Sequence, residues 1–234
     1  DLDGAIAGGL FSAFVASGQT CVSGARFIVH RDNYNVFVTG ISARADSITL
    51  GDPMADTTQM GPVISKASQD RCKRMIATAK ADGAMQVAGA SDPNLPAPFD
   101  QGFYIRPTIF KDVRPEQELF LEEVFGPVIS ITPFDTEEEA LALANTGTFG
   151  LGVSIWSRDI ARAHRLSLGI RGGVIWLNDH HRNDPRSVWG GVRDSGFGKE
   201  NGWDALKAYM TKKSVIVRTA PSHDDWFAGS NRYG

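Results

Sequence analysis

The sequence has 234 residues, of which 42 % are hydrophobic and 22 % charged, and its formal net charge is −3. This length suits one large α/β domain or two small ones, and the composition is that of an ordinary globular protein. The charge leaves no electrostatic footprint for nucleic acid, and no apolar run approaches the roughly 20 residues that a membrane span needs. No secretory leader is recognisable, although a chain that begins at Asp1 rather than Met cannot be judged for one.

The two cysteines, Cys21 and Cys72, lie far apart in the sequence. Two isolated cysteines in a chain of this length do not make a disulfide framework, so a reducing, cytoplasmic compartment is the simpler interpretation. Neither belongs to a Cys-x-x-Cys pair, which argues against a structural zinc site. We therefore expect no bound metal.

The first part of the chain alternates between helical and extended patterns. Ala5, Ile6, Leu10 and Phe14 recur near helical spacing and predict a helix over 3–17 that ends at Gly18. The segments that follow are predicted as a strand at Arg26–His30 and helices at about 33–47 and 65–81. Within the last helix, the apolar positions form one stripe that we expect to be buried: Cys72, Met75, Ile76 and Ala79.

The second part predicts a regular strand and helix alternation after a Pro- and Gly-rich surface loop at 89–102. Thr136 and Glu139 resemble a capping box that opens a helix ending near Asn145. The expected strands are 104–110, 127–134, 151–156, 173–178 and a late strand at 214–218, with a further helix at 159–168. This alternation predicts an α/β fold with a mostly parallel sheet and helices on both faces. The polar loop 179–189 leaves a strand at the edge where such sheets carry their sites.

Several residues could carry chemistry, and for each a plainer interpretation competes. Cys21 lies among Gly and small residues, which suits a thiolate nucleophile, but a cysteine is also a common inert core residue. Glu123 precedes an apolar strand and could bind a ribose, but a solvated surface charge is the favoured interpretation. His180 and His181 could be a metal pair, yet solvent-exposed loop residues are the favoured interpretation. No Gly-x-Gly-x-x-Gly dinucleotide fingerprint is present.

Six segments, taken in order, resemble conserved blocks of the aldehyde dehydrogenase superfamily over residues 1 to about 218. They are Gly-Gln-Thr-Cys at 18–21, Gln-Met-Gly-Pro-Val-Ile-Ser at 59–65, Gly-Phe-Tyr-Ile-Arg-Pro-Thr at 102–108, Glu-Glu-Val-Phe-Gly-Pro at 122–127, Asn-Thr-Gly-Thr-Phe-Gly-Leu at 145–151 and Trp-Gly-Gly-Val-Arg-Asp-Ser-Gly at 189–196. Any one of these motifs is weak, but six in the same order are specific. Ala16 and Ser23 stand where many relatives carry other residues.

The resemblance implies a role for each matching residue. Cys21 would attack an aldehyde through a thiohemiacetal and a thioester, with NAD or NADP as the cofactor. Glu123 would bind the nicotinamide ribose and Phe125 would pack beside it. The aldehyde pocket would be lined by Thr20, His181, Asn183 and Trp189. The polar character of the 179–189 loop, which includes Arg182, favours a polar or aromatic aldehyde over a long aliphatic one.

The resemblance also implies an organisation. Residues 1–212 would form the cysteine-bearing half of the catalytic domain, 213–218 an oligomerisation strand that pairs across subunits, and 219–234 a tail. The family's cofactor-binding domain, general-base glutamate and oxyanion-hole asparagine belong to an N-terminal half that this sequence does not contain. We therefore expect a homo-oligomer, a dimer or tetramer, and no appreciable aldehyde oxidation by this chain alone. The alternative is a non-catalytic module used for oligomerisation or binding.

Overall fold

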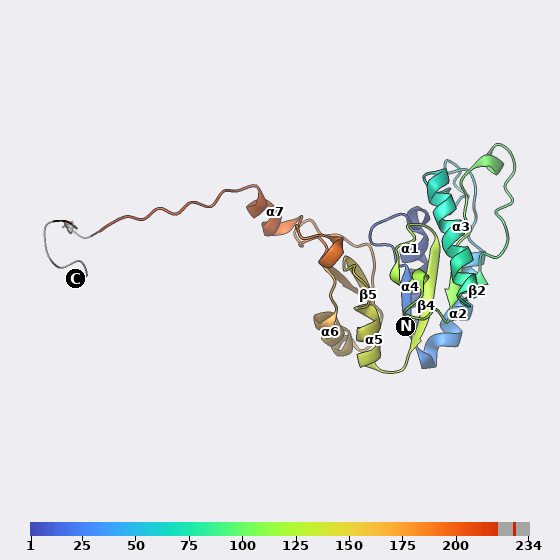
Figure 1. Cartoon of the computed structure of the whole chain (residues 1–234), viewed down its shortest axis with the longest axis horizontal. Coiled ribbons are helices and arrows are strands. Elements are labelled where there is room, and N and C mark those ends of the chain that lie inside the picture. The colour runs from blue at the N-terminus through green and yellow to red at the C-terminus, as the bar shows by residue number, and fades with distance from the viewer. Residues whose placement is uncertain (220–226, 228–234) are drawn as a thin grey trace.

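The computed structural model describes residues 1–219 and 227 and shows an α/β architecture (Figure 1). Its strands are β1 (Arg26–His30), β2 (Met85–Ala88), β3 (Thr108–Lys111), β4 (Val128–Phe134), β5 (Gly152–Ile155) and β6 (Val174–Leu177). Its helices are α1 (Leu2–Phe14), α2 (Arg31–Asp46), α3 (Lys66–Ala81), α4 (Glu118–Leu121), α5 (Glu137–Ala144), α6 (Ile160–Gly169) and α7 (Gly202–Ala208). Short 3-10 turns are η1 (Val15–Gly18), η2 (Phe99–Gln101) and η3 (Arg193–Ser195). The predicted fold class is confirmed.

The strands form two sheets. The larger sheet has the order β1-β4-β3-β2, in which β1, β4 and β3 run parallel and β2 pairs antiparallel with β3 at the edge. The smaller sheet is the parallel pair of β5 and β6. The mainly parallel pairing agrees with the prediction. The edge strand β2 was not predicted, because four residues containing a polar Gln86 carry too little alternation to signal a strand.

Side chains of the central strands alternate between two helical layers. Ile109, Ile129 and Ile131 pack in one apolar cluster with α1 and α2. Phe110 and Val128, which are the sequence neighbours of Ile109 and Ile129, pack in a second cluster with α3 and α4. Because successive strand residues point to opposite faces, this alternation places helices on both faces of the sheet, as expected.

Helix α3 follows its predicted boundaries closely. The Ser65 hydroxyl accepts a hydrogen bond from the Ser68 amide at 3.2 Å and caps the helix N-terminus. Cys72, Met75 and Ala79 of the predicted stripe are buried, whereas Ile76 is only partly buried. The Cys72 sulfur lies so close to Gly126 that a Cβ at Gly126 would overlap it. Helix α3 therefore supports the loop that contains Gly126.

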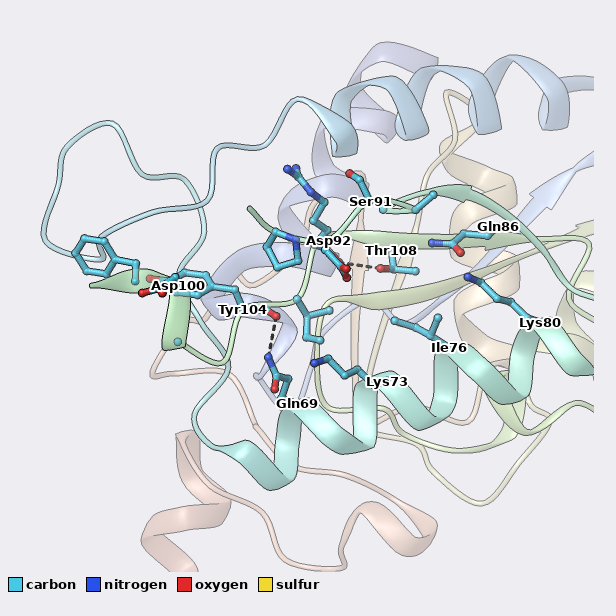
Figure 2. A pocket seen from close by; sticks show the side chains of 17 residues that line it. Gln69, Lys73, Ile76, Lys80, Gln86, Ser91, Asp92, Asp100, Tyr104 and Thr108 are labelled. Atoms are coloured by element: carbon cyan, nitrogen blue, oxygen red, sulfur yellow. Dashed lines mark hydrogen bonds between the residues drawn. The ribbon is translucent and has the colours of Figure 1, made fainter. Parts of the chain in front are cut away.

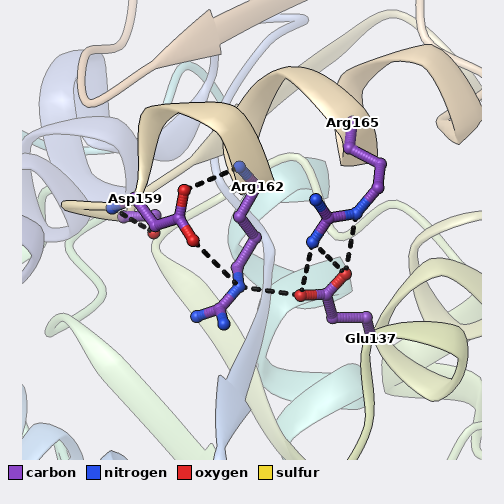
Figure 3. A network of polar contacts seen from close by, with 5 residues as sticks. Glu137, Asp159, Arg162 and Arg165 are labelled. Carbon is purple, nitrogen blue, oxygen red and sulfur yellow. Dashed lines mark hydrogen bonds and ion pairs between the residues drawn. The ribbon is translucent and has the colours of Figure 1, made fainter.

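A network of polar side chains joins α5 to α6 beside the smaller sheet (Figure 3). The Asp159 carboxylate caps α6 by accepting a hydrogen bond from the Arg162 amide at 2.9 Å. The Glu137 carboxylate accepts from Arg162 at 2.7 Å and from Arg165 at 2.8 Å. The hydrogen bond from Arg165 is the main reason that the pKa of Glu137 is lowered. The network orients the two helices but lies in solvent, which weakens its energetic contribution.

The strand expected over 104–110 is shorter than predicted. Only Thr108–Lys111 forms β3, and Pro107, which has no N–H group, directly precedes it. Tyr104 is buried instead as part of the preceding loop, where its hydroxyl donates to the Gly51 carbonyl at 2.8 Å. The prediction of one continuous strand was therefore wrong for residues 104–107.

The late strand expected at 214–218 is also absent from the described structure. The segment extends away from both sheets (Figure 1), and none of the described strands pairs with it. Val215, Ile216 and Val217 are 76 %, 92 % and 73 % exposed. Its β-branched residues carry strand propensity, but a strand forms only where a partner supplies hydrogen bonds.

Candidate active site

Cys21 lies at the tip of a tight turn between η1 and β1. The Ser23 amide donates to the Thr20 carbonyl at 3.0 Å, and the Thr20 amide donates to the Ser23 hydroxyl at 3.3 Å. Cys21 itself is exposed and its thiol is free. Cys72, by contrast, is fully buried, and burial raises the pKa of its thiol to about 11. Of the two thiols, only that of Cys21 is presented to a reactant.

The chain enters this turn through a strained backbone. Ala16, Ser17 and Gly18 follow one another in the left-handed region, with φ of 50°, 58° and 68°. A Cβ at Gly18 would lie 2.5 Å from the carbonyl oxygen of Gly126, so only glycine fits there. Strain of this kind persists only where the surroundings enforce it, and it is common at functional sites.

Gln19 connects the Cys21 turn to the loop expected to hold the cofactor. Its amide nitrogen donates to the Phe125 carbonyl at 3.3 Å, and its amide oxygen accepts from the Ile64 amide at 2.8 Å. Phe125 is 40 % exposed with a φ of 54°. Glu123 has an exposed side chain, and its backbone carbonyl accepts a hydrogen bond from the Arg71 guanidinium. Both cofactor candidates therefore lie in one loop next to the Cys21 turn.

A pocket of about 410 Å³ lies beside the other end of the turn. Its lining residues are Gly8, Phe11, Trp156, Asp179, His180, His181 and Arg182. The Nε2 atom of His181 lies 3.0 Å from the Thr20 hydroxyl, which places the pocket wall one residue from Cys21 in the sequence. The structure thus brings together Thr20, Cys21 and His181.

Asn183 and Trp189 lie farther along the same loop and do not line this pocket. Asn183 is exposed. Trp189 forms a two-hydrogen-bond bridge with Glu200, at 2.8 and 2.7 Å, and its ring lies 6.2 Å from that of Trp176. Trp189 is therefore connected to the site through the ring of Trp176.

His180 is the residue that the sequence interpretation misplaced. It was expected as a solvent-exposed loop residue, but it is only 6 % exposed. Its Nε2 atom donates to the Val22 carbonyl at 2.7 Å, and its ring lies 4.7 Å from that of Trp176. Burial is the main cause that lowers the pKa of His180, and burial also lowers the pKa of His181. A polar loop sequence gives no signal that one of its members turns inward.

A second groove, of about 430 Å³, lies between α3 and the loop that leads into β3 (Figure 2). Gln69 spans part of it by donating to the Tyr104 carbonyl at 3.2 Å, while Lys73 and Lys80 extend along it from α3. None of the residues predicted to be catalytic or cofactor-binding lines this groove. It is therefore separate from the Cys21 site.

The described residues contain no group of three or more side chains arranged to hold a metal ion. Across the same part of the chain, no helix has the length and apolar character needed to cross a bilayer.

The α/β fold brings the exposed Cys21 turn next to the loop that carries Phe125 and to the pocket that His181 lines. A family model described as "Aldehyde dehydrogenase family" matches residues 1–215, and the chain belongs to this family. The resemblance drawn from the six sequence segments is confirmed.

Two curated proteins that this chain resembles are betaine aldehyde dehydrogenases, one from Sinorhizobium fredii and one from Brucella anthropi. Each is 39 % identical over 93 % of this chain. Among solved structures, betaine aldehyde dehydrogenase from Staphylococcus aureus in complex with NAD+ superposes with a TM-score of 0.91 at 32 % identity, over 98 % of this chain and 45 % of that one. A variant of aldehyde dehydrogenase from Bacillus cereus gives a TM-score of 0.87 at 34 % identity, over 93 % of this chain and 43 % of its own. The chain spans about 44 % of the length of the curated relatives.

Proposed function

We propose that this chain is the cysteine-bearing part of an NAD(P)-dependent aldehyde dehydrogenase and that Cys21 is its nucleophile. One observation above all supports this role. The exposed Cys21 thiol lies in a tight turn that contacts the Phe125 loop through Gln19 and the His181 pocket through Thr20. A nucleophile between an open pocket and a second open loop can meet an aldehyde on one side and a cofactor on the other.

The chemistry follows from the thiolate. The sulfur of Cys21 adds to the aldehyde carbonyl carbon and gives a thiohemiacetal alkoxide, which accepts a hydrogen bond from the Cys21 backbone amide. Loss of hydride from that carbon leaves a thioester on Cys21. Water then releases the carboxylic acid and restores the thiol. When bound, the nicotinamide cofactor supplies the hydride acceptor.

Glu123 and Phe125 are the proposed cofactor-binding residues, for NAD or NADP. The exposed Glu123 carboxylate fits a ribose because it can accept hydrogen bonds from two hydroxyl groups. Its backbone carbonyl is held by Arg71 and the neighbouring Phe125 carbonyl by Gln19, so the loop presents both side chains outward. The NAD+ complex of the Staphylococcus aureus relative agrees with a nicotinamide cofactor.

We propose a polar, cationic aldehyde as the substrate. Phe11, Trp156 and His181 supply aromatic surface to the pocket, and aromatic faces attract quaternary ammonium groups. Arg182 is paired with Asp179 at 3.3 Å, which offsets its repulsion of a cation. The names of the relatives make betaine aldehyde the first compound to test. Asn183 and Trp189 remain candidates for the outer part of the entrance.

The proposed organisation is a catalytic segment at 1–212, an oligomerisation strand at 213–218 and a tail at 219–234, most of which lies outside the described residues. Exposed Val215, Ile216 and Val217 favour pairing with a second chain, and hence a dimer or tetramer. The same exposure favours the alternative function, a non-catalytic oligomerisation module. Free thiols favour the cytoplasm as the compartment.

Cys21 acylation tests the proposed nucleophile in this chain. An activated ester such as p-nitrophenyl acetate should acylate one thiol per chain, and Cys21→Ala should abolish the burst while Cys72→Ala retains it. A burst that persists in Cys21→Ala would contradict the proposal.

Turnover is expected to be absent from the 234-residue chain alone. A missing general base costs roughly 10²–10⁴ in rate, and a missing oxyanion donor about 10²–10³. The assay is NADH or NADPH formation with betaine aldehyde and an aromatic aldehyde, using Cys21→Ala as the blank. Ordinary enzymatic turnover that this substitution abolishes would show that the chain is catalytically sufficient.

A further inference from the structure

His180 connects the Cys21 turn to the smaller sheet. Its Nε2 atom donates to the Val22 carbonyl at 2.7 Å, and its Nδ1 atom is hydrogen-bonded to the Ser154 hydroxyl on β5. Because a carbonyl only accepts, Nε2 must carry the proton, and Nδ1 of the neutral ring accepts from Ser154. Both ring nitrogens of this buried side chain are therefore engaged, and one of them holds the residue that follows Cys21.

His181 contacts the residue on the other side of Cys21. Its Nε2 atom lies 3.0 Å from the Thr20 hydroxyl, and its ring meets that of Phe11 edge-on at 5.4 Å. The backbone of His181 is in the left-handed region, with φ of 61°. Its Nδ1 atom is buried and finds no hydrogen-bond partner in the part of the chain that is described. Contacts with Thr20 and Phe11, rather than local preference, therefore hold the side chain in place.

We propose that His180 and His181 are positioning residues that hold the Cys21 turn from both sides, His180 through the Val22 carbonyl and His181 through the Thr20 hydroxyl. The inference rests on the proposed role of Cys21 as the nucleophile. This role differs from the two interpretations drawn from the sequence, in which the histidines either bind a metal ion or lie exposed in solvent.

The turn needs external contacts to be fixed in space. Its own hydrogen bonds, between Thr20 and Ser23, close the loop but do not attach it to the rest of the fold. The peptide before Cys21 carries the amide that would stabilise the alkoxide, so rotation of the turn moves this donor away from the reacting oxygen. A displacement of about 1 Å in such a group can cost on the order of a hundredfold in rate.

The packing of Val22 supports the same conclusion. A Cβ at Gly152 would lie 3.0 Å from Val22 and 2.8 Å from the Trp176 ring, so the Val22 side chain and Trp176 meet over β5. Val22 is thus held through its side chain by the smaller sheet and through its carbonyl by His180. The turn and the smaller sheet form one packed unit at this point.

Two reaction rates of Cys21, measured on the purified 234-residue chain, distinguish the orientation of the turn from the accessibility of the thiol. Alkylation of Cys21 by iodoacetamide needs only an exposed thiolate, whereas acylation by p-nitrophenyl acetate also needs the oriented Cys21 amide. His180→Leu should lower the ratio of acylation to alkylation about tenfold, and His180→Gln, whose amide can still donate to the Val22 carbonyl, should stay within about threefold of the unsubstituted chain. His181→Phe keeps the ring against Phe11 and should lower the ratio through loss of the Thr20 contact. His164→Leu, at an exposed histidine of α6, is the matched control.

Hydrogen exchange of peptides covering residues 18–24 supplies a readout that does not depend on Cys21 chemistry. Exchange should accelerate about tenfold in His180→Leu and in His181→Phe, because the Ser23 amide loses its protection when the turn is released. A folded His180→Leu with an unchanged ratio and unchanged exchange overturns the proposal. The proposal is also overturned if His180→Gln lowers the ratio of acylation to alkylation as much as His180→Leu does. If His180→Leu fails to fold, the proposal is tested with His181→Phe, by the ratio of acylation to alkylation and by hydrogen exchange. Absence of acylation in the unsubstituted chain would instead contradict the role of Cys21, while exchange would still test the contacts.

Discussion

Replacement of Gly18 by alanine should destabilise the chain through two separable effects. The first is conformational, because a φ of 68° puts a Cβ in the left-handed region at a cost of about 1–2 kcal/mol. The second is steric, because the new Cβ would lie 2.5 Å from the Gly126 carbonyl oxygen and 2.9 Å from the Pro127 nitrogen. Crowding into a packed backbone costs a further ~1–3 kcal/mol. Together these give a loss of about 2–5 kcal/mol.

Gly83 provides the control that separates these effects. Its φ is 84°, but a Cβ there would meet no atom within 4 Å. Gly83→Ala therefore carries only the conformational cost, part of which is offset by about 0.4–1 kcal/mol of lost freedom in the unfolded chain. The net loss should be about 1 kcal/mol or less.

Urea unfolding followed by circular dichroism measures both losses, with an unchanged m-value as the sign that the unfolded state is comparable. Gly18→Ala should also slow acylation of Cys21, since relief of the contact must displace the turn or the Phe125 loop. Equal losses of stability in Gly18→Ala and Gly83→Ala would refute the argument, because the close approach to Gly126 would then contribute nothing.

Three further outcomes are expected. Iodoacetamide should modify Cys21 and spare Cys72 in the folded chain, because Cys72 is fully buried and its pKa is raised to about 11; preferential labelling of Cys72 by mass spectrometry would contradict this. The free energy of unfolding should fall as the pH drops below the ordinary histidine pKa of 6.5, because burial lowers the pKa of His180 and His181, so the unfolded chain binds more protons. The slope is at most about 1.4 kcal/mol per pH unit for each histidine, and it should be smaller in His180→Gln. Replacing Ile216 by lysine should shift light-scattering masses toward the monomer, and a chain that is monomeric at every concentration before substitution would refute pairing through this segment.

Sequence periodicity was sufficient for the elements that form the core. The stripe of Cys72, Met75 and Ala79 defined α3, and Arg26–His30 was predicted with the boundaries that β1 has. These elements are predictable because burial of one face constrains many residues at a fixed spacing. The segment 214–218 has the same strand propensity, but none of the described strands pairs with it, so propensity alone did not produce a strand.

The geometry around Cys21 could not be predicted from the sequence, because it depends on tertiary contacts. Ala16, Ser17, Phe125 and His181 all adopt left-handed backbone conformations that non-glycine residues disfavour. Ala16 and Ser17 lead into the Cys21 turn, Phe125 lies in the loop that also contains Glu123, and His181 is one of the paired histidines. At each of these positions tertiary contacts override the local backbone preference. The family motifs predicted roles for Cys21 and Glu123, because those motifs record chemistry. The inward turn of His180 depends on Val22 and Ser154, which are 158 and 26 residues away, and no local pattern encodes it. Stability in the core follows local patterns, whereas the arrangement of this site depends on contacts that oppose them.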